Sequence, residues 1–135
     1  MKVRTDELTG IALDWAVAKC EKAEIQYRPD GELYIAWAYN PANKRYSTNW
    51  LEGGLIIERE GIHLRSVRSE GHILNNSWLA KKANGNTGQT EHWYKTLFKS
   101  QIAMWYGQTP LIAAMRCYVA SKLGDEVDIP EELLK

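Results

Sequence analysis

Apolar residues recur at helical spacing near the C-terminus. Residues 109–124 begin with Thr109 and Pro110, which suit the N-cap and the first helical position, and end at Gly124, which suits a helix terminus. The apolar residues between them cover one broad arc, namely Leu111, Ile112, Met115, Tyr118, Val119 and Leu123. Because the opposite side carries small residues rather than charges, we expect this helix to pack on more than one side.

A second helix is predicted near the N-terminus, where Thr5 is followed by Asp6 and Glu7 in the order of a helix start. Its apolar stripe consists of Leu8, Ile11, Ala12, Trp15 and Ala16. Asp14 is the only acid in the body of this helix, and Arg116 lies near the middle of the C-terminal helix. We therefore weigh two roles for Arg116, which are an ion pair with Asp14 inside the fold and contact with an anionic ligand.

The pattern between these helices is that of strands and turns. Strand-like segments lie at 32–40, 55–60 (LIIERE), 62–68 and 77–80. Residues 84–90 have loop composition, residues 92–106 fit a helix or a pair of strands equally well, and the acidic C-terminal segment holds at most one helical turn, at Pro130. This order predicts a single α+β domain over residues 1–135, with a small antiparallel sheet and the N-terminal and C-terminal helices packed on one face.

Charge and composition narrow the class of protein. Seventeen basic residues balance seventeen acidic ones, so the chain lacks the basic surplus of a general nucleic-acid binder, although a local basic patch is allowed. No apolar run approaches the length of a membrane span, and the N-terminus does not read as a signal peptide. We expect a cytoplasmic protein in which Cys20 and Cys117 are small core residues.

Catalytic and metal-binding motifs are not visible in the sequence. His63, His72 and His92 stand alone, without metal-ligand spacing. Both cysteines lie in apolar helical patterns, where a thiolate is disfavoured. On a strand, Glu58 and Glu60 would share one face, an arrangement more typical of a solvated surface than of acid–base chemistry. We therefore expect no catalytic residue, no metal and no cofactor, and we predict that the protein is not an enzyme.

The sequence does offer binding chemistry, because it contains six tryptophans and seven tyrosines. Aromatic rings, hydroxyls, an arginine and the N-terminus of the last helix suit a nucleotide-like ligand, and each base–aromatic stack contributes roughly 1–3 kcal/mol. Half-exposed sheet faces carry such rings equally often. The candidate ligand-binding residues are Tyr46, Ser47, Thr48, Trp50, Trp78, Trp105, Thr109 and Arg116.

Three blocks of the sequence, at 7–21, 46–64 and 107–133, together resemble the NinX-like family of small phage proteins, a domain of unknown function. The last block, GQTPLIAAMRCYVASKLGDEVDIPEEL, is the most specific. The family usually has an aspartate where Asn49 stands and a proline where Leu55 stands. The resemblance implies a phage accessory protein acting in the bacterial cytoplasm, with no activity attached.

Three functions remain open. By analogy with other small phage proteins, we favour a non-catalytic sponge that sequesters a nucleotide-derived signal of bacterial immunity, such as a cyclic ADP-ribose isomer or a cyclic dinucleotide. The second hypothesis is a protein–protein module that inhibits a host or defence protein through exposed tryptophans. The third, an enzyme that cleaves such a nucleotide, has the least support. The sequence does not fix the oligomeric state, and a homo-oligomer is allowed.

Overall fold

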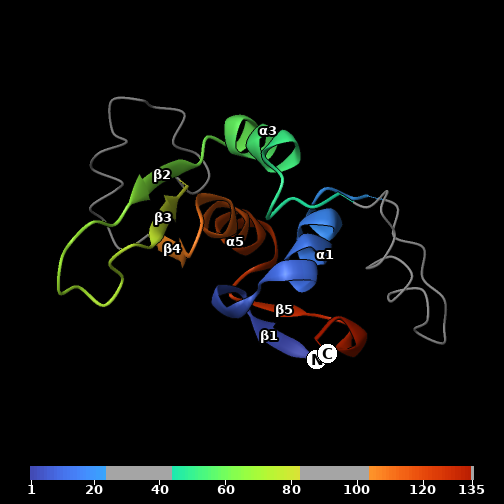
Figure 1. The fold of residues 1–135 in the computed structure, drawn as a ribbon. Helices are drawn as coiled ribbons and strands as arrows, with labels where there is room; N and C mark the ends of the chain where they lie inside the picture. The colour runs from blue at the N-terminus through green and yellow to red at the C-terminus, as the bar shows by residue number, and fades with distance from the viewer. Residues whose placement is uncertain (24–43, 83–103, 135) are drawn as a thin grey trace.

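Helix α5 (Pro110–Leu123) runs through the centre of the fold, and the other elements pack around it (Figure 1). The computed structural model describes residues 1–23, 44–82 and 104–134. The Thr109 side chain accepts a hydrogen bond from the backbone N–H of Ile112, and the helix ends before Gly124, as predicted. Most of its residues are buried, so the expected packing on more than one side is confirmed.

A three-stranded antiparallel sheet packs against α5. Its strands, in spatial order, are β2 (His63–Ser66), β3 (Trp78–Lys81) and β4 (Met104–Gly107). Side chains alternate between the faces of a strand, and Leu64, Ala80 and Trp105 lie in one cross-strand row that packs into the core with α5. A Cβ at Gly107 would lie 2.6 Å from the backbone nitrogen of Ala113, so glycine permits the close approach of α5.

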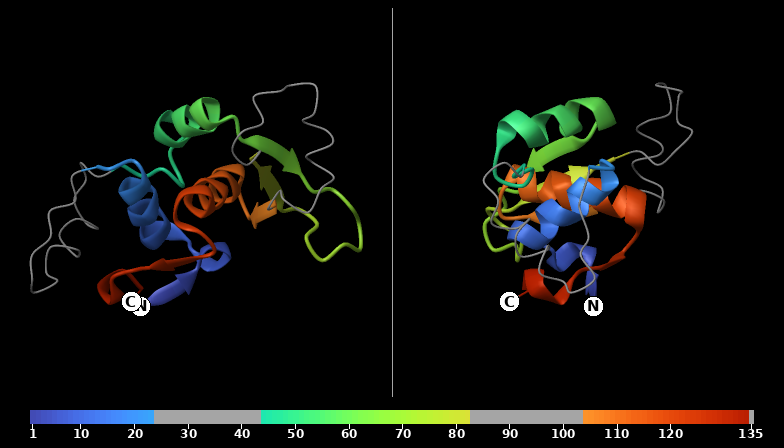
Figure 2. Two further views of the ribbon diagram at one scale, coloured as in Figure 1. Left: turned by 180° about the vertical axis from the view of Figure 1, so that it is seen from behind. Right: turned by 90° about the vertical axis from the view of Figure 1, so that its right-hand side faces the viewer.

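Helix α1 (Gly10–Cys20) packs on α5 on the side away from the sheet (Figures 1 and 2). The prediction that the N-terminal and C-terminal helices lie on one side of the sheet is therefore confirmed, with α5 next to the sheet and α1 packed on α5. The predicted start of the first helix at Thr5 is wrong, because Thr5–Glu7 form a separate 3-10 turn, η1. Thr5 donates from its backbone N–H to Asp125 and from Oγ1 to the Gly124 carbonyl, at 2.8 and 2.7 Å, so it does not cap a helix.

The two ends of the chain pair with each other. Strand β1 (Lys2–Arg4) runs antiparallel to β5 (Glu126–Asp128), and the 3-10 helix η3 (Glu131–Leu134) follows. The N-terminal ammonium of Met1 lies 2.8 Å from the Asp128 carboxylate, and both termini lie side by side (Figure 2). The pattern did not predict either strand, since three residues are too few to show alternation.

The segment 55–60, predicted as a strand, lies in helix α3 (Trp50–Glu60) instead. The Asn49 side chain caps the helix by accepting a hydrogen bond from the backbone N–H of Leu51 at 3.0 Å, and Gly61 ends it with a φ of 65°. The strand prediction was wrong because a short apolar run does not distinguish a strand from a buried helical turn. Here the cap residues at both ends decide in favour of the helix.

The α+β class with an antiparallel sheet is confirmed, as are strands within 62–68 and 77–80. At most one helical turn was expected at Pro130, and the 3-10 helix η3 follows that residue. Some predictions lie outside the described residues, namely those for 32–40, for 84–90 and for the part of the ambiguous segment at 92–103. None of the helices in the described part of the chain is long and apolar enough to cross a membrane.

Candidate functional site

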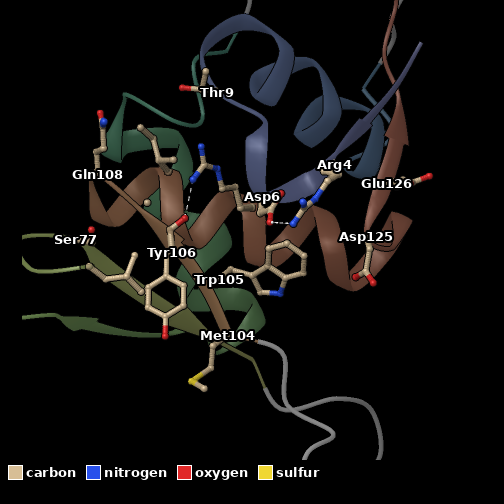
Figure 3. Close-up of a pocket in the computed structure, with 14 residues that line it drawn as sticks. Arg4, Asp6, Thr9, Ser77, Met104, Trp105, Tyr106, Gln108, Asp125 and Glu126 are labelled. Atoms are coloured by element: carbon tan, nitrogen blue, oxygen red, sulfur yellow. Dashed lines mark hydrogen bonds and ion pairs between the residues drawn. The ribbon is translucent and has the colours of Figure 1, made fainter. Parts of the chain in front are cut away.

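A groove of about 980 Å³ lies between β4, at the edge of the described sheet, and the N-terminal segment of the chain. Helix α5 contributes Ile112 and Arg116 to its lining. The lining also includes Arg4, Asp6, Trp105, Tyr106, Asp125 and Glu126 (Figure 3). Segments more than 100 residues apart in the sequence therefore meet at this groove, because β1, β4 and α5 come together there.

Arg116 connects the two sides of the groove. Its Nε donates to the Leu8 carbonyl oxygen at 2.8 Å, and its Nη1 donates to the Tyr106 carbonyl oxygen at 2.7 Å. The side chain is partly buried, and burial lowers the pKa of its guanidinium, with Asp6 opposing that shift at longer range. Within the described residues no carboxylate lies at ion-pair distance from Arg116. A half-buried cation is thus held by carbonyl dipoles, with its charge not neutralised by an acid.

Asp14 is not the partner of Arg116, so the ion pair that we weighed as one alternative does not form. Asp14 is buried in α1 and accepts a hydrogen bond from the backbone N–H of Ser47 at 2.8 Å. Burial raises the pKa of the Asp14 carboxyl, while the hydrogen bonds from Ser47 and the charge of Arg45 oppose that rise. The two residues lie on neighbouring helices but face different parts of the fold.

Charges on the groove wall are partly paired. Arg4 and Asp6 form an ion pair at 2.6 Å, and Figure 3 shows the Trp105 ring beside this pair. Asp125 and Glu126 are exposed at the rim. Carboxylates accept hydrogen bonds, so these two acids suit hydroxyl or amino groups rather than phosphates. Sequence reasoning missed all four residues, because only the pairing of distant β1 and β5 brings them to the groove.

The predicted ligand-binding residues divide into two groups. Of the eight, Trp105 and Arg116 line the groove, while the lining contains neither Trp78 nor Thr109. Trp78 lies on the α5 side of β3 with Arg68 over its ring, and Thr109 is engaged as the helix cap. The structure therefore brings together only one ring and one cation from the predicted set.

The run at 46–50 lies elsewhere, in the turn that precedes α3 and at the first residue of that helix. Tyr46 and Ser47 are buried there, whereas Thr48 and Trp50 are exposed. None of these residues lines the groove. The Asn49 cap fixes the chain at the start of α3, with Tyr46 and Ser47 on the buried side and Thr48 and Trp50 on the exposed side.

Two further clusters have structural rather than binding roles. Arg59 of α3 donates to both carboxylate oxygens of Glu21, and the Tyr118 hydroxyl donates to Glu21 at 2.7 Å. This network joins α1, α3 and α5.

Burial raises the pKa of the Cys117 thiol to about 12, and Cys20 behaves in the same way, so both are poor nucleophiles. Across the described ranges, no group of three or more His, Cys, Asp or Glu residues is arranged to hold a metal ion.

These features define a small α+β protein built around one buried helix, with an open groove at the edge of its sheet. Residues 4–122 match the family model described as Bacteriophage P22, NinX, and the chain belongs to that phage family. The match spans most of the chain and confirms the resemblance seen in the sequence. A comparison with curated proteins finds no match. The family description names no activity.

Proposed function

We propose that this phage protein is a non-catalytic binder that sequesters a nucleotide-derived signal of bacterial immunity in the groove beside β4. The observation that carries the proposal is the half-buried guanidinium of Arg116, which faces the groove without a carboxylate partner in the described part of the chain. A phosphate would add a charge-assisted hydrogen bond to this cation, which is stronger than a neutral one.

The other groups of the groove suit the remaining parts of a nucleotide. Trp105 offers a ring for stacking on a base, and Asp125 and Glu126 accept hydrogen bonds from sugar hydroxyls or base amino groups. The acids at the rim disfavour a ligand of high negative charge. The groove therefore suits a compact ligand with few phosphates, such as a cyclic ADP-ribose isomer or a cyclic dinucleotide, in the bacterial cytoplasm.

A thermal-shift screen against these two ligand classes tests the proposal. Binding should raise the melting temperature as the ligand concentration rises, and heat denaturation should release the ligand unchanged, as checked by mass spectrometry. Release of stoichiometric cleavage products would instead favour the nucleotide-cleaving enzyme. No shift with any member of either class would contradict the sponge.

A second candidate, a module that inhibits a host or defence protein, is favoured by one observation on α3. Trp50, Leu51 and Leu55 are 54, 77 and 65% exposed on this helix. Large apolar side chains exposed together are typical of protein-binding surfaces. If this candidate holds, Leu51→Glu together with Leu55→Glu abolishes inhibition of the partner and leaves any nucleotide binding in the groove unchanged.

A further inference from the structure

The outer face of the three-stranded sheet, which points away from α5, carries basic and aromatic side chains. The strand register places six residues in two cross-strand rows on this face, with His63, Lys81 and Met104 in one row and Arg65, Leu79 and Tyr106 in the other. The alternating residues lie on the opposite side, where Ala80 belongs to the core and Leu64 and Trp105 are partly buried against it. The outer face is thus a surface distinct from the core-facing side.

Most of this outer face is accessible. Arg65 and Met104 are exposed, with Met104 at 52%, and Lys81 and Tyr106 are partly exposed. Leu79 is buried at the centre but is not part of the main hydrophobic core. Long side chains therefore surround an apolar centre, which gives a platform with charged edges.

The charge of this face is unbalanced, although the whole chain is neutral with seventeen charges of each sign. Arg65 and Lys81 are cations, and none of the six positions is acidic. Within the described ranges neither cation forms an ion pair. In contrast, Lys82, the residue after β3, lies 2.7 Å from Glu60 of α3. The fold thus neutralises Lys82, whereas Lys81 forms no ion pair within the described part of the chain.

We propose that the outer face binds single-stranded nucleic acid, with Arg65 and Lys81 contacting phosphates and Tyr106 stacking on a base. Sheet faces that combine cations with an aromatic ring bind single strands because every unpaired base presents a π-face. A duplex hides the faces of its bases, so the Tyr106 ring adds nothing to duplex binding. The two cations distinguish this site from the proposed sponge function, because Arg65 and Lys81 do not line the groove, whereas Tyr106 borders both surfaces.

Fluorescence anisotropy with a labelled oligo-dT of about ten nucleotides tests the charge contribution. Each phosphate contact to a single strand contributes about 0.7 to the slope of log K against log salt, so Arg65→Gln with Lys81→Gln should reduce the slope by about 1.4 between about 50 and 200 mM salt. The matched control, Lys2→Gln with Lys22→Gln, removes two exposed cations outside this face and should leave the slope unchanged.

The stacking contribution is tested at Tyr106. Tyr106→Leu should weaken binding by about fivefold or more, while Tyr106→Trp should retain it. Three results would overturn the proposal, namely no binding by the wild-type protein at low salt, equal slope changes in the two double variants, or equally tight binding of a duplex of the same length. Because Arg65 is exposed and Lys81 partly exposed, their variants keep the test valid even if a Tyr106 variant fails to fold.

Discussion

The guanidinium of Arg116 and the backbone carbonyl of Tyr106 are joined by a hydrogen bond of 2.7 Å across the groove. Strand β4 lies at the edge of the described sheet, and this bond ties it to α5. The second bond, to Leu8, ties the N-terminal segment to the same side chain. An otherwise apolar helix thus carries an arginine because it links the sheet edge to the N-terminal segment.

The link between Arg116 and the two carbonyls predicts the outcome of a double-mutant cycle. Arg116→Met should lower the free energy of unfolding by about 2 kcal/mol, because it removes two hydrogen bonds from a charged donor. Asp14→Ala should lower the free energy of unfolding independently of Arg116→Met. The interaction energy between the two substitutions, measured by urea unfolding, should be below about 0.5 kcal/mol. Recovery of stability in the double variant by more than about 1 kcal/mol would show an ion pair between these residues.

The two adjacent glycines of α3 should respond in opposite directions to alanine. A Cβ at Gly53 would collide with the Tyr46 carbonyl oxygen and lie 2.6 Å from Leu111 Cδ2, so Gly53→Ala should destabilise the protein by more than about 2 kcal/mol. A Cβ at Gly54 meets only the Trp50 ring, at 3.8 Å, so Gly54→Ala should stabilise the helix by about 0.5–1 kcal/mol. Urea unfolding measures the change in unfolding free energy of both variants. If both variants were stabilised or both destabilised, the packing described for α3 would be contradicted.

The central position of α5 predicts large effects of truncating its buried face. Met115 is fully buried, so Met115→Ala should cost about 2–5 kcal/mol of unfolding free energy, and Leu111→Ala should cost a similar amount. Leu51→Ala is the control, because Leu51 is 77% exposed and its truncation should change stability by less than about 0.5 kcal/mol. Losses below about 1 kcal/mol at both buried positions would show that α5 is peripheral.

Glu60 should contribute stability that depends on pH. Hydrogen bonds from Lys82 and Arg59 lower the pKa of its carboxyl from 4.5 to about 2 in the folded protein. A lowered pKa stabilises the fold above pH 4.5, and that contribution is lost as the pH falls toward 2. The pH dependence expected from Asp14 is the opposite. Burial raises the pKa of its carboxyl, so its contribution to folding stability becomes more favourable as the pH falls.

The test compares Glu60→Gln with Glu58→Gln by urea unfolding at about pH 7 and about pH 2.5. Glu60→Gln should cost on the order of 1–2 kcal/mol at neutral pH and much less in acid, allowing for solvent screening of the pairs. Glu58 is exposed and forms no ion pair in the described part of the chain, so its variant should differ little at either pH. If Glu60→Gln lowers the free energy of unfolding equally at both pH values, the lowered pKa of Glu60 does not contribute to stability.

The sequence predicted the elements whose signals are local. Thr109, Pro110 and Gly124 mark both ends of α5, and alternation from residue 62 onward marks β2. The segment 55–60 was predicted wrongly because its apolar run suits a strand as well as a helix, and the caps Asn49 and Gly61 were not used to decide.

The site was less predictable, because its residues meet only through tertiary contacts. Trp105 and Arg116 were predicted from residue type, and the fold brings both to the groove. Asp125 joins them there because β5 pairs with β1 across almost the whole chain. Arg116 bonds to backbone carbonyls, whose positions no side-chain pattern reveals, so the partner Asp14 suggested by charge alone was wrong.

Isothermal titration of a ligand found in the thermal-shift screen tests the groove most directly. We expect stoichiometric binding by the wild-type protein and a loss of roughly 1–3 kcal/mol in binding free energy for Trp105→Leu. Trp50→Ala should leave the affinity unchanged, since Trp50 is exposed outside the groove. Urea unfolding of both variants confirms that each is folded. Unchanged affinity in Trp105→Leu together with weakened affinity in Trp50→Ala would rule out the groove as the binding site and place the ligand at α3.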